Sequence, residues 1–251
     1  MTDARERLIL ALDAPPYDAR NPDRPIELRD ALHFIGLLGK IVSFVKIGWP
    51  LYMAAPHGHR DLIREFTNRG LRVFLDLKFG DIPETVRRLV LEATRAEADL
   101  LTLNASPAAI RAAAETRGES KLKLLAVTLL TSEDAEDLRR MGLQTSVEKF
   151  VLAKAQGALK EGRADGVIAS GQEAAALRQK LGKDFLIVTP GIRSQGVGHH
   201  DHKRATTPAE AIRAGADYLV VGRPITQAPD PKEATLKILD EMQKAFDSLR
   251  G

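Results

Sequence analysis

The stretch FLDLKFGDIPETV, Phe74–Val86, carries the strongest fold signal in the chain. It begins as an apolar run typical of a buried strand and passes into a helix start, with Pro83 in the first turn. Because side chains alternate along a strand, Asp76 and Lys78 share one face with Phe74. In parallel α/β folds, ligands bind at the carboxyl ends of the strands. The stretch therefore predicts an acid and a base side by side at such a position.

Asp81 stands where this strand gives way to the helix. It is expected to be the helix N-cap, with Glu84 three residues further on. Taken alone, the Asp76–Lys78 pair has a second interpretation as a structural ion pair, because buried pairs also occur for purely structural reasons. The remainder of the chain decides between the two interpretations.

The composition fits one α/β domain over residues 1–251, of which 44% are hydrophobic. The absence of cysteine excludes disulfides and thiolate–metal sites, and it is consistent with a cytoplasmic location. The first residues lack the apolar core of a signal peptide, and no apolar run approaches the ~18 residues of a membrane span. We therefore expect no membrane association.

The charges are mixed in sign along the chain, with a net charge of +3. No basic stripe is interleaved with stacking aromatic residues, so the sequence argues against nucleic acid as a partner. A small positive excess is compatible with a phosphorylated small-molecule substrate.

Strand-like apolar runs alternate with helical patterns along the whole chain. The expected strands are Leu8–Asp13, Phe44–Gly48, Val73–Lys78, Leu100–Ala105, Leu124–Leu130, Gly166–Ser170, Phe185–Pro190 and Tyr218–Gly222. The expected helices are Leu28–Gly39, Arg60–Asn68, Pro83–Ala96, Ala108–Thr116, Val147–Lys160, Glu173–Lys180, Pro208–Ala214 and Lys232–Leu249. Eight such units without a break in composition predict a single (β/α)8 barrel. A doubly wound sheet is the alternative, but the turn after Asp13 lacks the GxGxxG of a dinucleotide site.

Polar side chains gather at the ends of these strands, which converge on one mouth of a barrel. They are Asp13, Lys46, Asp76, Lys78, Asn104, either Thr128 or Thr131, Gln195 and Arg223. The first four charges alternate in sign, so each can be held ionised by its neighbours. Their coincidence at strand ends favours a catalytic site over a structural network. Gly222-Arg223-Pro224 and the Arg193-containing segment after the seventh strand suit a phosphate group, which barrels often bind at this position.

Two long irregular stretches, Ala14–Pro25 and Gly191–Thr207, follow the first and seventh strands. Long loops on the catalytic rim are usually functional. Within the second loop, His199, His200 and His202 are interpreted as exposed residues and not as metal ligands.

The chain resembles orotidine 5'-phosphate decarboxylases over nearly its whole length and in the same order of motifs. The matching motifs are LALD at 10–13, VKIG at 45–48, DLKFGDIPETV at 76–86, VTLLTS at 127–132, VTPGIR at 188–193 and VGRPIT at 221–226. The resemblance implies a barrel without metal or organic cofactor. It also implies a homodimer that converts orotidine 5'-phosphate to uridine 5'-phosphate and CO2 in pyrimidine biosynthesis.

The resemblance also assigns roles to individual residues. Lys46, Asp76, Lys78 and Asp81 would form the catalytic array, with Asp81 entering from the neighbouring subunit. The implied substrate contacts are Asp13, Ile82, Thr85, Thr131, Pro190, Arg193, Gln195, Gly222 and Arg223. Asn104 departs from the pattern, because many relatives of this barrel group carry histidine there.

Two alternative functions remain open from the sequence. A metal-dependent sugar-phosphate decarboxylase or lyase of the same barrel group shares the DxKxxD pattern, but it carries an acid where this chain has Lys46. A non-catalytic binder of nucleotide phosphates is the other alternative, and the intact Asp76, Lys78 and Asp81 argue against it.

Overall fold

Eight parallel strands close into a barrel in sequence order, and β8 pairs with β1 to complete it. The computed structural model describes residues 3–13, 27–55, 59–193 and 204–249. The strands are β1 (Leu8–Ala11), β2 (Phe44–Gly48), β3 (Arg72–Phe79), β4 (Leu100–Leu103), β5 (Lys123–Val127), β6 (Gly166–Ile168), β7 (Leu186–Thr189) and β8 (Tyr218–Val221). The predicted (β/α)8 barrel is confirmed, and the doubly wound alternative is wrong.

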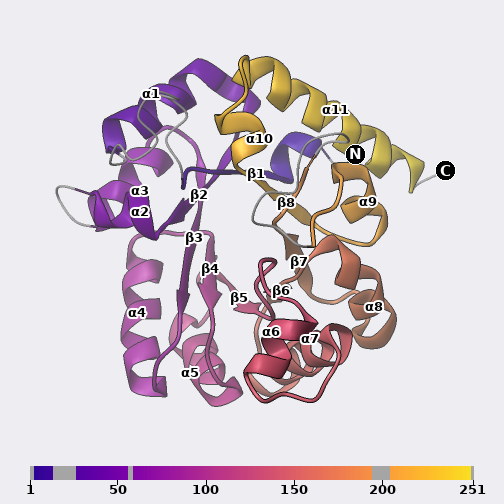
Figure 1. Ribbon diagram of the computed structural model, residues 1–251. Coiled ribbons are helices and arrows are strands. Elements are labelled where there is room, and N and C mark those ends of the chain that lie inside the picture. Colours follow the sequence, from indigo (N-terminus) through magenta and orange to yellow (C-terminus); the bar gives the residue numbers. More distant parts are fainter. Residues whose placement is uncertain (1–2, 14–26, 56–58, 194–203, 250–251) are drawn as a thin grey trace.

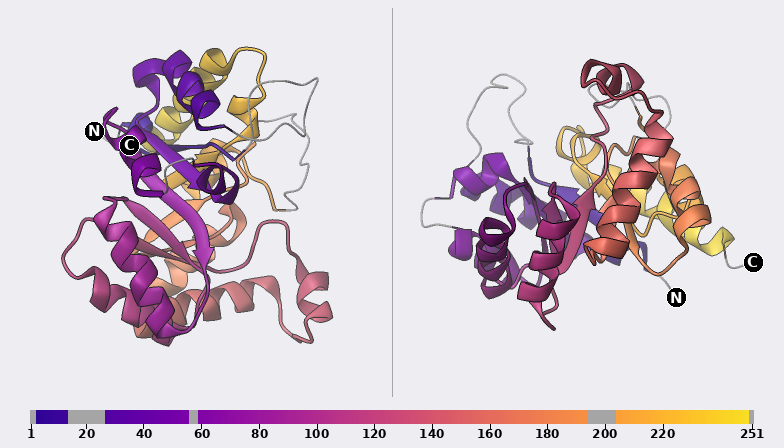
Figure 2. Two further views of the ribbon diagram at one scale, coloured as in Figure 1. Left: turned by 90° about the vertical axis from the view of Figure 1, so that its left-hand side faces the viewer. Right: turned by 90° about the horizontal axis from the view of Figure 1, so that it is seen from below.

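Helices surround the barrel on its outside, as Figure 1 shows, and Figure 2 shows the segment around α6 projecting from this ring. The α-helices are α1 (Leu28–Leu38), α2 (Trp49–Met53), α3 (His59–Thr67), α4 (Pro83–Arg95), α5 (Pro107–Arg117), α6 (Ala135–Arg140), α7 (Val147–Gln156), α8 (Gly171–Leu181), α9 (Pro208–Arg213), α10 (Arg223–Thr226) and α11 (Pro231–Ser248). The 3-10 turns are η1 (Ala4–Glu6) and η2 (Gly39–Ile41), and η3 (Gly157–Glu161) is a π-helical turn. None of the helices in the described ranges is long and apolar enough to cross a bilayer.

The barrel interior is filled by alternate strand residues, while the others pack against the helices. The inward-facing apolar set is Ile9, Ala11, Phe44, Phe74, Leu100, Leu125, Val127, Ile168, Val188, Tyr218 and Val220. At the amino end, the guanidinium of Arg72 lies 4.1 Å from the centre of the Phe44 ring, which closes the interior from below. The cavity described below lies at the other, carboxyl end of the barrel.

Three aspartates join neighbouring strands at this amino end. Asp99, Asp165 and Asp217, here called the amino-end aspartates, directly precede β4, β6 and β8. Each accepts a hydrogen bond from the backbone N–H of a residue in or next to the preceding strand. The donors are Val73 at 2.9 Å, Leu124 at 2.8 Å and Ile187 at 2.7 Å. Each also pairs with an arginine: Arg72, Arg117 and Arg178 respectively.

The start of α4 differs from the sequence prediction. Ile82, and not Asp81, is the N-cap residue, and its side chain makes no capping bond. The cause is Pro83 at the first helical position, which forces the residue before it into an extended conformation. Asp81 instead accepts a hydrogen bond from the Ile82 N–H at 2.7 Å, so its carboxylate stays at the surface.

Both long loops fall largely outside the described residues. The predicted Ala14–Pro25 loop does so entirely, as do Gln195, His199, His200 and His202 of the second loop. The described ends of the second loop are joined, because the Arg193 N–H donates to the Thr206 carbonyl at 3.0 Å.

Candidate active site

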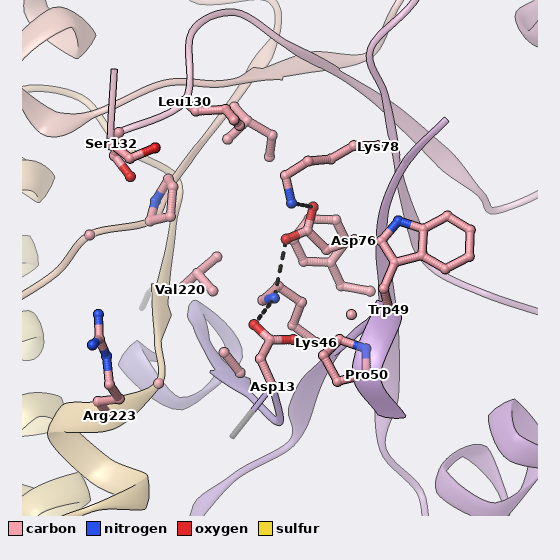
Figure 3. Close-up of a pocket in the computed structure, with 18 of the residues that line it drawn as sticks. Asp13, Lys46, Trp49, Pro50, Asp76, Lys78, Leu130, Ser132, Val220 and Arg223 are labelled. Carbon is pink, nitrogen blue, oxygen red and sulfur yellow. Dashed lines mark hydrogen bonds and ion pairs between the residues drawn. The ribbon is translucent and has the colours of Figure 1, made fainter. Parts of the chain in front are cut away.

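A cavity of about 640 Å³ opens at the carboxyl ends of the strands. This is within the usual range for pockets that hold a small organic ligand. Its walls come from β1, β2 and β3 on one side and from the segments after β5, β7 and β8 on the other. Figure 3 shows Arg223 on the far side of the cavity from Asp76 and Lys78.

Four charged side chains form a continuous chain along the first wall. Lys46 Nζ contacts a carboxylate oxygen of Asp13 and lies 3.1 Å from Oδ2 of Asp76. Lys78 Nζ lies 2.8 Å from the other oxygen, Oδ1, of Asp76. Signs therefore alternate from Asp13 to Lys78, as the sequence predicted for these positions. We call these residues the charged array (Figure 3).

Burial and charge act against each other within this array. Burial alone would lower the pKa of Lys46, but the carboxylates of Asp76 and Asp13 outweigh it and hold that pKa above its ordinary value. Burial alone would raise the pKa of Asp76, but Lys46 and Lys78 outweigh it and hold that pKa below its ordinary value. Both groups therefore stay ionised at neutral pH inside a largely desolvated wall.

Asp13 has one oxygen that the protein leaves available. Its Oδ1 is buried and has no hydrogen-bond partner within the described part of the chain. A Cβ atom at Gly48 would lie 2.2 Å from this oxygen, so only glycine lets β2 pass so close to it. Because Asp13 lines the cavity, its carboxylate is a candidate acceptor for a ligand hydroxyl.

The opposite wall carries the cationic groups. Arg223 begins α10, directly after β8, and Gly222 precedes it. Arg193 is buried and follows β7, and its guanidinium donates to the Ile192 carbonyl at 2.7 Å. All three residues line the cavity together with Thr131 and Pro190. An anionic group is therefore favoured on this side.

The segment after β5 is held in place by Arg204. This buried guanidinium donates to the Leu130 carbonyl at 2.7 Å and pairs with the buried Glu173 at 2.6 Å. Glu173 in turn caps α8 through Ser170. Arg204 was not predicted from the sequence, because nothing in the pattern of a solitary loop arginine distinguishes a buried anchor from a solvated charge.

Several predicted site residues lie elsewhere. Asn104 is exposed and accepts a hydrogen bond from Lys154 Nζ at 3.4 Å, so its predicted place in the mouth is wrong. Of the two threonines left open after the fifth strand, Thr131 lines the cavity, whereas Thr128 donates to the Ile168 carbonyl. Asp81, Ile82 and Thr85 lie outside this cavity, at the start of α4.

Trp49, the first residue of α2, is a further lining residue. It lines the cavity, remains 46% exposed, and donates from its indole nitrogen to the Leu77 carbonyl at 2.9 Å. It also packs edge-on against Tyr52 and Phe79. These contacts fix the indole of Trp49 at the edge of the cavity.

Residues 6–238 match the orotidine 5'-phosphate decarboxylase / HUMPS family. The chain belongs to this family. It is 46% identical over 243 residues to an orotidine 5'-phosphate decarboxylase of Nitrobacter winogradskyi, covering 97% of this chain and 95% of the relative. It is 45% identical over 244 residues to one of Rhodopseudomonas palustris, covering 97% of each chain.

A solved structure of a family member agrees with the fold. The crystal structure of orotidine 5'-phosphate decarboxylase from Lactobacillus acidophilus superposes with a TM-score of 0.76 at 33% identity. The superposition covers 94% of this chain and 98% of that one. The family resemblance stated from the sequence motifs is confirmed.

The donor set of the charged array does not fit a divalent cation. Both oxygens of Asp76 and one of Asp13 are paired with lysine ammonium groups, which would repel a metal ion. Across the described residues, no cluster of three histidine, aspartate or glutamate side chains could hold a metal ion either.

Proposed function

We propose that this protein decarboxylates orotidine 5'-phosphate to uridine 5'-phosphate and CO2 in pyrimidine biosynthesis, without a metal or organic cofactor. The observation that carries the proposal is the charged array, which presents Lys78 and Asp76 to a cavity with arginines on its opposite wall. The family's curated relatives bear the name of this activity.

The reaction breaks the bond between pyrimidine C6 and the carboxylate carbon. The electron pair of that bond remains at C6, where no adjacent carbonyl delocalises it readily. An ammonium group beside C6 stabilises this charge and then transfers a proton to it. Lys78 is the cation best placed for both tasks, because its Nζ is partly exposed to the cavity. Lys78 regains its proton from water after CO2 has left.

Asp76 has two tasks in this scheme. Its carboxylate holds the Lys78 ammonium at 2.8 Å, and it stands beside the carboxylate of the substrate. The repulsion between the two carboxylates is relieved as CO2 departs. Lys46 keeps Asp76 ionised from its other side, and the carboxylate of Asp13, which lines the cavity, is the proposed acceptor for a ribose hydroxyl.

The phosphate belongs to the opposite wall. Arg223 and the N–H groups next to Gly222 supply a cation and donors there, and Arg193 adds a second guanidinium. Thr131 and Pro190 line the cavity on the segments after β5 and β7 and are the proposed contacts of the pyrimidine. Gln195 stays a predicted phosphate contact from the sequence.

The metal-dependent sugar-phosphate alternative is not favoured. It needs an acid at the position of Lys46, whereas this ammonium lies between Asp13 and Asp76. The decisive assay is turnover of orotidine 5'-phosphate, followed by the loss of its ultraviolet absorbance, with and without excess EDTA. Equal rates support the proposal. No turnover of this substrate refutes it, and a rate abolished by EDTA refutes the cofactor-free mechanism.

We further propose a homodimer in which each subunit completes the partner's site. Asp81, Ile82 and Thr85 lie outside their own subunit's cavity, and the Ile82 side chain is 66% exposed. Met53, at the end of α2, is 73% exposed. Apolar side chains that gather into one exposed patch are typical of an interface. Symmetry would bring Asp81 to the partner's cavity.

Mixing two inactive variants tests this arrangement. Asp81→Asn and Lys78→Ala are each expected to be nearly inactive as homodimers. After random exchange, half of the dimers are mixed, and each has one site with both native groups, so about a quarter of the activity per site returns. Mass spectrometry of differently tagged chains verifies the exchange. Full exchange without recovery would refute the shared site.

The remaining expectations concern the location of the protein in the cell and its macromolecular partners. A cytoplasmic location, and no nucleic acid or membrane partner, stay predictions from the sequence composition.

A further inference from the structure

Strand β3 is irregular where it carries the catalytic lysine. Leu75 pairs with Leu101, but the next pair in register is Phe79 with Leu103. Four steps along β3 therefore match two steps along β4, so β3 bulges between these pairs. Bulges of this kind re-aim a side chain next to an active site.

Lys78 lies in this bulge with an unusual backbone. Its φ angle is 49°, in the left-handed region that non-glycine residues avoid. Such a conformation costs about 1–2 kcal/mol and persists only where neighbouring groups hold it. Something must therefore hold the Lys78 backbone in this state.

Thr102 of β4 supplies the contacts. Its side chain is fully buried, and its Oγ1 accepts a hydrogen bond from the Lys78 N–H at 2.8 Å. The same Oγ1 lies 3.1 Å from Oδ1 of Asp76 and 3.5 Å from the Leu75 carbonyl. Because a hydroxyl has one proton, the shorter contact assigns that proton to Asp76.

These bonds close a ring through the two residues. It runs from the Lys78 N–H to Thr102 Oγ1, on to Asp76 Oδ1, and back to Lys78 Nζ at 2.8 Å. One hydroxyl thus fixes both the backbone of Lys78 and the carboxylate that orients its ammonium. A methyl group in its place would leave the buried amide and a carboxylate oxygen each without this partner.

We propose that Thr102 is a positioning residue that holds Lys78 and Asp76 in their reactive geometry. The inference rests on the proposed function, because the decarboxylation rate is one of its measures. Thr102 itself does not line the cavity and touches no substrate in this scheme.

The test compares Thr102→Ser with Thr102→Ala. Both variants remove the γ-methyl group, and only the serine keeps the hydroxyl. T102S is expected to retain most of the native kcat, whereas T102A is expected to lose about 10- to 100-fold, the size of loss that misplacing a reacting group produces. The affinity for uridine 5'-phosphate, measured by calorimetry, is expected to change less than about threefold in both, because the product lacks the carboxylate.

Thr235→Val is the matched control for loss of a buried hydroxyl. Thr235 is fully buried in α11, and its Oγ1 donates to the Pro231 carbonyl at 2.7 Å. T235V is expected to lower Tm while leaving kcat unchanged. Thr102→Val, which keeps the side-chain shape, should behave as T102A does.

A second readout needs no substrate. Amide hydrogen exchange at Lys78, followed by NMR, is expected to be slow in the native protein and in T102S and to accelerate at least tenfold in T102A. Equal kcat in T102S and T102A, or unchanged exchange at Lys78 in T102A, would overturn the inference. If the native protein does not convert orotidine 5'-phosphate, the proposed function fails, and the exchange result still decides whether Thr102 holds Lys78.

Discussion

At the amino end of the barrel Asp165 is bound by the Leu124 N–H and by Arg117, whereas at the carboxyl end Asp76 is held by the side chains of Lys46, Lys78 and Thr102. Both carboxylates are paired with cations at the end of a strand. Each amino-end aspartate accepts a hydrogen bond from a backbone N–H group of the preceding strand, so these bonds extend the hydrogen bonding of the sheet. The charged array is bonded to other side chains, and among the residues that the structure describes Oδ1 of Asp13 has no partner.

In this barrel, the difference distinguishes the ion pairs of the amino end from those of the charged array, although both are buried or half-buried and both carry charge. A carboxylate that accepts strand N–H groups satisfies donors that the fold itself creates. A carboxylate bonded only to side chains requires extra buried charges to remain ionised, which costs desolvation energy. Such an arrangement makes sense where a ligand uses the charges.

The largest effect is expected from removing the lysine at the carboxyl end of the barrel. Lys78→Ala should lower kcat by about 10²- to 10⁴-fold, which is the usual contribution of a general acid. Its circular dichroism spectrum should be unchanged. Lys123→Ala is the matched control, since Lys123 pairs with Asp165 at 3.3 Å at the amino end. The kcat of the Lys123→Ala variant should equal that of the native protein. A K78A enzyme with more than about a tenth of native kcat, a loss of only ~1.4 kcal/mol, would exclude Lys78 as the proton donor.

The next effect concerns the cationic wall. Arg223→Ala should weaken uridine 5'-phosphate binding by about 10- to 100-fold, the value of one or two charge-assisted hydrogen bonds. Uridine, which lacks the phosphate, should bind both proteins alike. Calorimetric titration of the two ligands measures the difference. Equal losses for both ligands would remove Arg223 from the phosphate site.

The amino end should respond in stability and not in rate. Asp165→Asn removes the charge that pairs with Arg117, and we expect a loss of about 2 kcal/mol in unfolding free energy, or roughly 4–8 °C in Tm. Urea titration and calorimetry measure it, with kcat recorded at 25 °C. A large fall in kcat at unchanged Tm would contradict the proposed division between the two ends.

The smallest effect is a pH dependence of stability. The pKa of Asp76 is lowered by folding, so its carboxylate stabilises the folded state above its unfolded pKa of about 3.9. That contribution is lost as the pH falls through the lower, folded-state pKa. The difference in unfolding free energy between the native protein and Asp76→Asn should therefore shrink as the pH drops from 6 to 3. A difference independent of pH would mean that Asp76 is not stabilised as the anion.

The barrel and the first wall of the site could be predicted from the sequence, because both rest on local patterns. Alternation placed Asp76 and Lys78 on one face, and the polar ends of eight strands converged by topology alone. The Asp81 cap was wrong because Pro83 acts on the residue before it. Asn104 was wrong because its side chain is bonded by Lys154, a partner 50 positions away that no local pattern reveals. Thr102 and Arg204 depend on contacts between residues 24 and 74 positions apart, beyond the reach of a pattern.

The amino-end aspartates also divide the barrel into quarters. The hydrogen bonds that they accept from backbone N–H groups join β3 with β4, β5 with β6 and β7 with β8. The Ser43 hydroxyl donates to the Arg5 carbonyl and so joins the segments that lead into β1 and β2. Of the boundaries between these quarters, the one between β2 and β3 has the longest ladder, with five residue pairs in register. At the mouth, the Lys46–Asp76 contact spans this same boundary. The ion pair that keeps Asp76 charged thus also ties two quarters of the barrel together, so a change that separated β2 from β3 would disturb the site as well as the sheet.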